Sequence, residues 1–540
     1  MFFLGNASGH DFQFHIASWM DAAGQWREGI VYPRWAEWAN WGFGEPRFVF
    51  YPPASWTLGA ALGTLLPWAA APGAFIWLAL VGGGMAMWKL AREWLPAPHA
   101  ALAAVLFAVN PYHLMIIYYR SAFGELLTGA FVPLVIYGAL RATRGEWRFV
   151  PLLAGAFAGI WLSDAPAAVV ATYALALTLV VLCVVRRNLW PLVPGVIAMA
   201  GGLGLAAFYI LPAAWERSWV QIGQVVADNL YPARNFLFTH TNDPDFVKFN
   251  WKVSWVAVGT MAVTLLAAIV VARKRRGLNE LFWVLAALAL ASTLLMWPLT
   301  NFLWRLLPEL QFVQFPWRWL EQLAVAFAFF VAAGMAGSRR RWVPWLAGIA
   351  VFVAISAAAT AMIRTAWWDS GDVPSMFAAI HSGGGYRGTD EYDPIGCDRY
   401  ELPGDPDDTE RVEGVSALPA QQVEKLDAES GGVAPASGVK ISVGRWSAEN
   451  RDFTAEASEP VTLAPRLLNY PAWDVRVDGA GIHPGMVHDT GQMLVPIPQG
   501  THRVSIRFRR TWDRLTGDAI SILSAISLLA FVRRIKARPA

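Results

Sequence analysis

The sequence predicts a polytopic α-helical membrane protein with a C-terminal extracytoplasmic β-sandwich, and three observations predict it. Hydrophobic residues make up 56% of the chain and charged residues only 15%, whereas soluble domains carry about 25% charge. The apolar residues fall in repeated runs of roughly 15–23, the length that crosses a ~30 Å hydrocarbon core. Many of the 29 tryptophans stand at the ends of these runs, which is typical of the aromatic belts at membrane interfaces.

The apolar runs predict about eleven spans. They cover residues 74–92, 98–118, 122–140, 149–163, 165–185, 191–211, 253–272, 280–297, 318–336, 342–364 and 514–532. A further apolar run at 54–70 is interpreted as an interfacial or re-entrant helix, because counting it as a span would place residues 5–53 in the cytoplasm.

The basic residues predict the orientation, because Lys and Arg are enriched in cytoplasmic loops. With these eleven spans, all of the basic clusters fall on one side of the membrane. The clusters are Lys89/Arg92, Arg141/Arg144/Arg148, Arg186/Arg187, Arg273–Arg276, Arg339–Arg341 and Arg533/Arg534/Lys536/Arg538. We therefore expect the C-terminus in the cytoplasm and the long polar segments outside.

Four regions follow from this topology. They are a first extracytoplasmic loop (1–73) with interfacial helices, a multi-span domain (74–364) with an outer loop at 212–252, an extracytoplasmic domain (365–513), and a final span with a basic tail (514–540). From about residue 440 apolar and polar residues alternate, as in Trp473, Val475 and Val477, and Asp478-Gly479 then supplies a turn. Alternation of this kind predicts antiparallel strands with one buried face, and hence a small sandwich.

The first loop holds the candidate site. An apolar residue recurs every three or four positions, as in Phe12, Ile16, Trp19, Ala23 and Trp26, which predicts an amphipathic helix lying in the membrane interface. Trp35, Trp38 and Trp41 predict a second interfacial segment.

Asp11 and His15 stand four residues apart at the start of the first helix, so their side chains should meet on one flank. A carboxylate, an imidazole and several arginines at a membrane surface suit chemistry on a lipid-linked phosphate. Asp11 is equally explained as a carboxylate favoured by the helix dipole. The chain carries no phosphate-binding loop, dinucleotide fingerprint or zinc-protease motif, so soluble nucleotide or hydrolase chemistry gains no support.

Several motifs together resemble a known family. Gly9-His10-Asp11-Phe12 with His15, then Tyr32-Pro33-Arg34-Trp35 and Phe50-Tyr51-Pro52-Pro53, resemble the first extracytoplasmic loop of GT-C glycosyltransferases. More narrowly, the chain resembles a bacterial membrane family labelled "6-pyruvoyl-tetrahydropterin synthase-related", although no residue pattern here indicates pterin chemistry. The resemblance continues through Asn110-Pro111-Tyr112, Arg120 with Glu125, Phe315-Pro316-Trp317-Arg318, Glu391-Tyr392-Asp393-Pro394, Asn469-Tyr470-Pro471-Ala472-Trp473 and Pro498-Gln499-Gly500-Thr501-His502-Arg503.

The resemblance implies transfer of a sugar from a polyprenyl-phosphate donor to a glycan or protein acceptor at the outer face of the bacterial cytoplasmic (inner) membrane. Asp11 would act as the general base. The substrate-binding candidates are Arg34, Arg47, Arg120 and Arg318, and His15 and His240 are candidate ligands of a divalent cation or the phosphate. The expected partners are the lipid bilayer, the lipid-linked sugar and its acceptor, with no nucleic acid.

The residues leave alternatives open. Arg120 and Glu125 suit a structural pair or a donor groove, and Arg318 suits interfacial anchoring as well as phosphate binding. A non-catalytic GT-C-like scaffold or lipid-linked-sugar binding protein is the main alternative function, and a transporter the lesser one. GT-C proteins normally have a span before the first loop, so we expect a start upstream of Met1 or a truncated chain.

Overall fold

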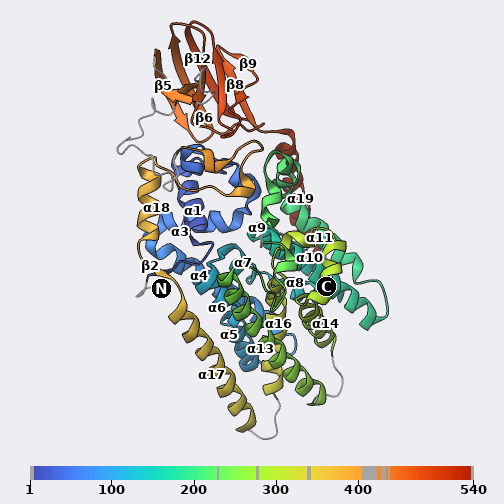
Figure 1. Cartoon of the computed structure of the whole chain (residues 1–540). Coiled ribbons are helices and arrows are strands. Elements are labelled where there is room, and N and C mark those ends of the chain that lie inside the picture. Colours follow the sequence, from blue (N-terminus) through green and yellow to red (C-terminus); the bar gives the residue numbers. More distant parts are fainter. Residues whose placement is uncertain are drawn as a thin grey trace.

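The protein is built in three layers along its long axis (Figure 1). The computed structural model describes residues 5–227, 230–274, 279–336, 342–403, 423–426, 433–435 and 438–536. A helical bundle carries a middle layer, formed by residues 5–70 and 366–403, and a β-domain, formed by the described residues of 423–508, lies beyond it. Helix α19 (Trp512–Lys536) leads from the β-domain back along the bundle.

The bundle contains the predicted spans. Within the described ranges, eight helical segments are long and apolar enough to cross a membrane, or up to ten if each of two bent pairs is one span; the predicted span 149–163 is a shorter apolar helix, Trp147–Ser163. Every predicted span therefore coincides with a helix. Besides α19, the bundle helices are α4 (Ala71–Ala91), α5 (Ala97–Ala108), α6 (Pro111–Met115), α7 (Phe123–Thr128), α8 (Val132–Thr143), α9 (Val150–Ser163), α10 (Ala165–Arg186), α11 (Leu192–Leu205), α12 (Ala207–Glu216), α13 (Pro244–Lys274), α14 (Glu280–Leu295), α15 (Asn301–Leu306), α16 (Leu320–Met335) and α17 (Trp342–Thr365).

Two of the predicted spans are bent. Leu192–Leu205 and Ala207–Trp219 meet at 72°, inside the predicted span 191–211. Glu280–Leu295 and Pro298–Leu306 meet at 92°, where Pro298, which has no amide hydrogen, begins a new turn. The apolar runs did not reveal these bends, because hydropathy carries no information on backbone direction.

Helix α17 packs little against the rest of the bundle, beside which it stands in Figure 1. In its apolar segment Gly348–Thr365 only 6% of the residues are buried, as expected for a helix facing lipid. Its last residue is held, because the hydroxyl groups of Tyr119 and Thr365 lie 2.7 Å apart. The short strand β2 (Trp368–Asp369) follows and pairs with β1 (Asn6–Ala7) in the middle layer.

The run at 54–70 does not form a span. Helix α3 (Pro53–Leu65) has 13 residues, about 20 Å at 1.5 Å per residue, which is shorter than the hydrocarbon core. It packs across α1 (Phe12–Arg27) at Gly59, where a Cβ atom would lie 2.0 Å from the Trp19 ring. The glycine is therefore required for the close approach of these two helices.

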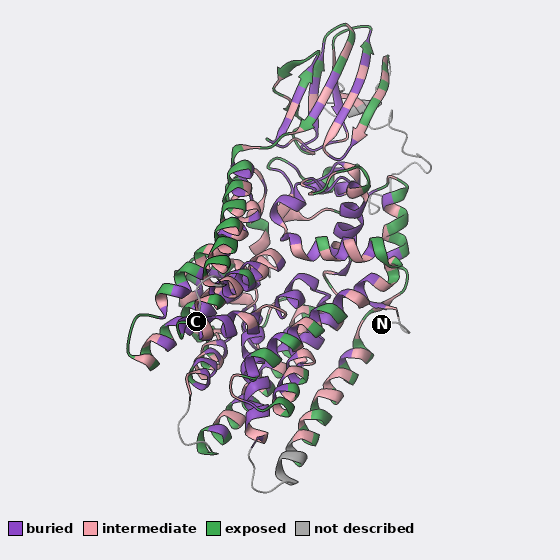
Figure 2. Cartoon of the chain, turned by 180° about the vertical axis from the view of Figure 1, so that it is seen from behind, coloured by how far each residue is buried: buried purple, intermediate pink, exposed green. Residues whose placement is uncertain are grey.

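Helix α1 differs from the predicted amphipathic surface helix, because protein covers both of its faces. Its predicted apolar face is buried, and so is most of its polar face, as Figure 2 shows for the middle layer. The polar face is satisfied internally: the Asp21 carboxylate accepts from Gln25 Nε2 at 2.7 Å and from Tyr386 Oη at 2.8 Å. The sequence pattern could not distinguish water from a second layer of protein, here α18 (Asp372–His381), on the polar side.

The second predicted interfacial segment is also internal. Trp35 is fully buried and its ring meets Trp473 of the β-domain edge-on at 5.1 Å. A buried ion pair joins α12 and α19 of the bundle, since both carboxylate oxygens of Glu216 accept from the Arg514 guanidinium at 2.7 Å. Tyr470 Oη donates to the same carboxylate at 2.5 Å. The aromatic residues at 35–41 and 470–473 therefore form an interface between the middle layer and the β-domain.

The β-domain is the predicted antiparallel sandwich, built from two five-stranded sheets ordered β10-β11-β7-β3-β4 and β5-β6-β12-β8-β9. Val475 and Val477 of one sheet and Val495 of the other are buried in a shared core, as the alternation predicted. Asp478 and Gly479 both have positive φ in the turn between β8 and β9, which suits a two-residue hairpin. The strands are β3 (Val423–Leu426), β4 (Val433–Pro435), β5 (Val439–Ser447), β6 (Asn450–Ala457), β7 (Val461–Pro465), β8 (Trp473–Val477), β9 (Ala480–Ile482), β10 (Gly485–Met486), β11 (Met493–Ile497) and β12 (Gly500–Phe508).

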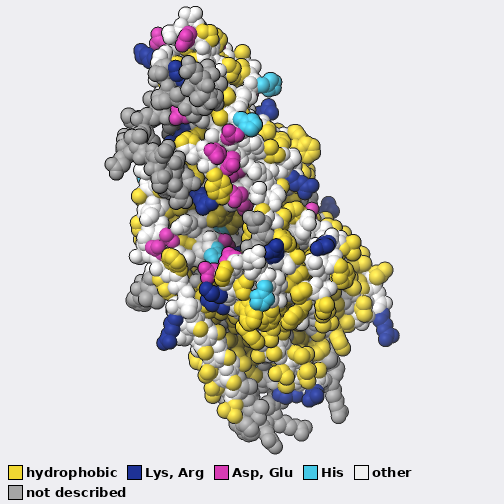
Figure 3. Space-filling view, viewed as in Figure 1, with side chains coloured by type: hydrophobic (Ala, Val, Ile, Leu, Met, Phe, Trp, Pro, Cys, Tyr) yellow, Lys and Arg dark blue, Asp and Glu magenta, His cyan; other side chains and the backbone are white. Residues whose placement is uncertain are grey.

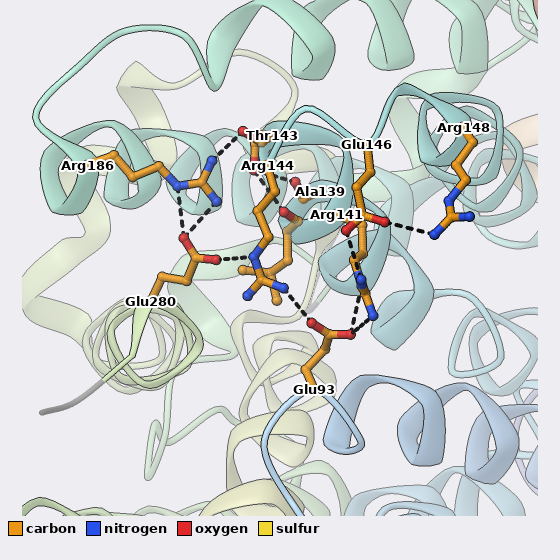
Figure 4. A network of polar contacts seen from close by, with 10 residues as sticks. Glu93, Ala139, Arg141, Thr143, Arg144, Glu146, Arg148, Arg186 and Glu280 are labelled. Carbon is orange, nitrogen blue, oxygen red and sulfur yellow. Dashed lines mark hydrogen bonds and ion pairs between the residues drawn. The ribbon is translucent and has the colours of Figure 1, made fainter. Parts of the chain in front are cut away.

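At the bundle end far from the β-domain, basic residues form one network with three glutamates (Figure 4). Trp147 beside this network contacts Phe531 near the far end of α19, which fixes its location. Glu93 accepts from Arg141 at 2.8 Å and from Arg144 at 2.6 Å, and Glu280 accepts from Arg144 at 2.5 Å and from Arg186 at 2.6 Å. The network therefore ties together the ends of α4, α8, α10 and α14.

Four residues of the predicted basic clusters thus share one end of the bundle: Arg141, Arg144, Arg148 and Arg186. Arg275, Arg276, Arg339–Arg341 and Arg538 lie outside the described residues. That this end faces the cytoplasm stays a prediction.

Replacing Glu280 by Gln should destabilise the bundle, because two guanidinium groups lose their shared carboxylate in a mostly buried setting. We expect a loss of about 1–3 kcal/mol in the free energy of unfolding. Thermal unfolding of the purified chain in detergent, followed by tryptophan fluorescence, measures it. Asp245→Asn is the matched control, since its pair with Lys248 is highly exposed and exposed pairs contribute about 0–1 kcal/mol. Equal melting temperatures for the two variants would contradict the role given to the network.

Candidate functional site

The segment that carries Asp11 is fixed by backbone hydrogen bonds to the π-helical turn η3 (Ile116–Arg120) and to the residues after α17. Ser8 N donates to Trp367 O at 2.8 Å, and Asp11 N donates to Arg120 O at 2.9 Å. Asp11 is thus placed by a segment more than a hundred residues away along the chain.

Gly9 and Ser121 make this contact possible. A Cβ on Gly9 would lie 2.4 Å from the carbonyl carbon of Arg120, so no larger residue fits without a shift. Ser121 has φ of 54°, and its Oγ both donates to Ala7 O at 2.7 Å and accepts from Gly9 N at 3.0 Å. The glycine of the Gly9-His10-Asp11-Phe12 motif therefore serves close backbone approach.

The Asp11 carboxylate points away from its own helix. Asp11 is the N-cap of α1, yet its side chain makes no capping hydrogen bond. Its Oδ2 instead accepts from Arg120 Nη2 at 3.2 Å. The side chain of Asp11 is 38% exposed while that of Arg120 is only 6% exposed. Capping of the helix therefore does not explain the position of the Asp11 side chain. Its carboxylate is accessible and is bonded to a buried guanidinium group.

Glu125 at the start of α7 lies at the centre of the cluster. Its carboxylate accepts from Arg120, from the hydroxyl of Tyr112, and from Arg318 Nε at 3.3 Å. Burying a carboxylate is costly unless it is paired and hydrogen-bonded, and these three donors satisfy it. Arg120 and Glu125 therefore form a buried ion pair.

Aromatic side chains enclose the two guanidinium groups. The Arg120 guanidinium lies 5.1 Å from the ring centroid of Trp317, and both Arg120 and Arg318 face Phe315, at 5.5 and 5.2 Å. Arg318 Nη1 also donates to Val313 O at 2.9 Å. The Phe315-Pro316-Trp317-Arg318 motif, which forms the turn η10 (Pro316–Trp319) before α16, thus packs directly on the Asp11 cluster.

The cluster lies where three candidate spans end. Arg120 ends one, Phe123–Thr143 with Glu125 begins another, and Pro316–Met335 with Arg318 begins a third. Figure 3 shows acidic, basic and histidine side chains gathered on one face between the apolar bundle and the β-domain. Asp11 is therefore at the boundary between the membrane-spanning part and the middle layer.

Two predicted phosphate-binding arginines, Arg34 and Arg47, are not joined to the Asp11 cluster and have other partners. Arg47 is buried and already donates to Glu45 at 2.7 Å, Ser18 at 3.0 Å and Thr389 at 3.1 Å. Arg34 lies over the Tyr32 ring at 4.3 Å, and its backbone N–H donates to Glu449 of the β-domain at 3.1 Å. Arg47 thus holds parts of the middle layer together, and Arg34 contacts the β-domain. Of the predicted arginines, Arg120 and Arg318 belong to the Asp11 cluster.

The predicted metal-binding histidines are not placed together. His15 is 2% exposed, its Nε2 accepts from Phe123 N at 3.2 Å, and its Nδ1 faces Tyr51 Oη at 3.4 Å, so no lone pair is free. The sequence predicted that the His15 side chain contacts Asp11, but its hydrogen-bond partners are Phe123 and Tyr51. His240 is exposed and lies beside Trp251. No group of three or more His, Cys, Asp or Glu residues in the described part of the chain is placed to hold a metal.

Sequence reasoning missed the roles of Tyr112 and Ser121. The signal for Tyr112 was present, because Asn110-Pro111 is a strong helix start, and Asn110 Oδ1 indeed accepts from the backbone amides of Tyr112 and His113 at 2.9 and 3.0 Å. That start aims Tyr112 at Glu125. No sequence signal indicated the left-handed Ser121.

Comparisons with known proteins give a family and a distant structural likeness. The model of the family described as "6-pyruvoyl-tetrahydropterin synthase related domain; membrane protein" matches residues 48–365. The match includes Arg120, Glu125 and Arg318 and begins after Asp11. No curated protein matches the sequence significantly. A solved structure, the apo oligosaccharyltransferase of Archaeoglobus fulgidus, is 14% identical, with a TM-score of 0.40 over 67% of this chain and 53% of that one. The chain thus spans about half the length of that protein.

Replacing Gly9 by Ala should displace the Asp11 segment, because the new methyl group overlaps the backbone of Arg120. We expect a loss of about 1–3 kcal/mol in the free energy of unfolding, as for other overpacked sites. Gly24→Ala in the following helix α1 is the control, since nothing lies within 4 Å of its Cβ position. Thermal unfolding of the two variants compares them, and equal stability would contradict the close packing.

His15 should give the protein a stability that falls in acid. Burial, as the largest cause, lowers the pKa of His15 from 6.5 to about 4. A lowered folded-state pKa stabilises the protein above pH 6.5, and this stabilisation is lost as the pH falls toward 4. The difference in stability between wild type and His15→Gln should therefore shrink by at most about 3 kcal/mol over this range. Urea unfolding between pH 7 and pH 4 tests it, and a constant difference would contradict the burial of a neutral imidazole.

Proposed function

The chain belongs to the 6-pyruvoyl-tetrahydropterin synthase related family of membrane proteins, and we propose that it is a GT-C-type glycosyltransferase. In this proposal it transfers a sugar from a polyprenyl-phosphate donor to a glycan or protein acceptor. The observation that carries the proposal is the accessible Asp11 carboxylate, held by buried Arg120 at the level where three candidate spans end. An amphiphilic donor places its phosphate at that level.

The reaction assigned to Asp11 is general-base catalysis of an inverting displacement. The carboxylate removes the proton of the acceptor hydroxyl, whose oxygen attacks the anomeric carbon of the donor sugar. The bond between that carbon and the phosphate oxygen breaks, and polyprenyl phosphate leaves with both electrons. The salt bridge from Arg120 orients the carboxylate, and Glu125 and Trp317 hold Arg120 in place.

The proposal also fixes an orientation. The β-domain and the Asp11 cluster would lie on the extracytoplasmic face of a bacterial inner membrane, and the Glu93–Arg141 network on the cytoplasmic face. The enrichment of Arg in that network supports this orientation. A divalent cation at the exposed Asp11 carboxylate stays a prediction, without His15 as a ligand.

A specific observation favours a second function, binding of a lipid-linked sugar without transfer. The two guanidinium groups of the cluster are matched by two carboxylates, so the charges of Asp11, Glu125, Arg120 and Arg318 cancel. Such a balanced cluster could serve as a scaffold. Loss of transfer on removal of the base, with the fold intact, separates the two functions.

Asp11→Asn should abolish transfer while leaving the protein folded, because it removes the base and keeps the side-chain shape. We expect a loss of at least about 100-fold, the usual contribution of a general base. Mass spectrometry of envelope glycans compares cells that lack the gene with cells complemented by wild type, Asp11→Asn or Asp245→Asn, each expressed from the full-length gene. Asp245 is an exposed helix carboxylate of α13 and serves as the control. A glycan restored equally by Asp11→Asn would refute the proposed base.

A further inference from the structure

The charged cluster at Asp11 has no spare positive charge for a donor phosphate. Arg120 donates to both Asp11 and Glu125, and Arg318 donates to Glu125. Arg34 and Arg47 are engaged in other layers, as described above. A phosphate monoanion or diester at this boundary therefore requires a cation outside the predicted set.

We propose that Lys252 of α13 binds the phosphate of an isoprenyl-type lipid at this site, an inference that rests on the proposed function for the identity of the lipid. The first turns of α13 lie over the cluster: the Phe249 ring is 5.6 Å from His10 and 6.0 Å from Trp317. Three residues later, on the same face, Lys252 Nζ lies 4.8 Å from the ring centroid of Tyr119, the neighbour of Arg120.

Lys252 is exposed, and no carboxylate of the described residues forms an ion pair with it. Lys248, one turn earlier on the same helix, differs because it pairs with Asp245 at 2.9 Å. Lys252 therefore carries the uncompensated charge at the rim of the Asp11 cluster. An ammonium group of this kind pairs with a phosphate as a compact point charge.

The length of α13 places Lys252 at the depth of a lipid phosphate. The helix has 31 residues, about 46 Å, whereas about 20 residues cross a ~30 Å hydrocarbon core. Its far end is marked by Arg273 and Lys274. Counting about 20 residues back from Arg273 reaches Lys252, and the polar residues Asp245 and Lys248 then project beyond the core.

Binding of geranylgeranyl monophosphate to the purified full chain in phosphatidylcholine nanodiscs tests the inference. We expect Lys252→Ala to weaken binding about tenfold or more, as for loss of a charge-assisted contact, and Lys252→Arg to retain most of it. Lys248→Ala is the matched control and should bind like wild type. Geranylgeraniol, which lacks the phosphate, should bind weakly and equally to all four proteins.

Equal affinity of wild type and Lys252→Ala for the phosphorylated probe would overturn the inference, as would no binding by wild type or an equal loss in Lys248→Ala. Full competition by inorganic phosphate at the same concentration would show a free-phosphate site and overturn the lipid assignment. Binding is measured without transfer, so failure of this inference and failure of the proposed base are distinguished. Binding that depends on Lys252 without any transfer would count against the proposed enzyme alone.

Discussion

The buried carboxylate of Glu125 is the interaction on which the candidate site depends. It stands between the guanidinium groups of Arg120 and Arg318 at the ends of three apolar helices, where an unpaired charge would be expensive. Glu125 neutralises both arginines and binds Nη1 of Arg120, which leaves Nη2 of Arg120 to donate to Asp11. The accessible carboxylate of Asp11 is thus positioned by Arg120, the same residue that neutralises the buried carboxylate of Glu125.

The same need decides which arginines of this chain are structural. Arg47 and Arg514 are both buried, and each is matched by a glutamate, Glu45 and Glu216. Breaking such a pair leaves an uncompensated charge inside the protein. Arg47 therefore stabilises the middle layer, and Arg514 fixes α19 on α12. Whether an arginine is structural or serves binding therefore depends on how exposed its carboxylate partner is.

Apolar run length predicted the spans of the bundle, although not the short helix α15, and two-residue alternation predicted the strands around Val475 and Val495. Each pattern reports a surface that lies in one uniform environment, either lipid or a single protein core. Helix α1 was assigned to the membrane surface because a polar face has the same sequence pattern whether water or protein covers it, and Asp21 is covered by Tyr386. For the site, motifs identified Asp11, Arg120, Glu125 and Arg318, but they could not show that Arg34 and Arg47 were already engaged.

Helix α17 is almost unsupported by the bundle and is followed at once by β2, which pairs with the strand just before Gly9. The same end of α17 is bonded to Tyr119 beside Arg120. A helix held mainly by lipid takes its tilt from the bilayer thickness. A change in the tilt of α17 would therefore reach the contact between Asp11 and Arg120 through β1 and Tyr119. In this way the lipid environment becomes part of the surroundings of the site.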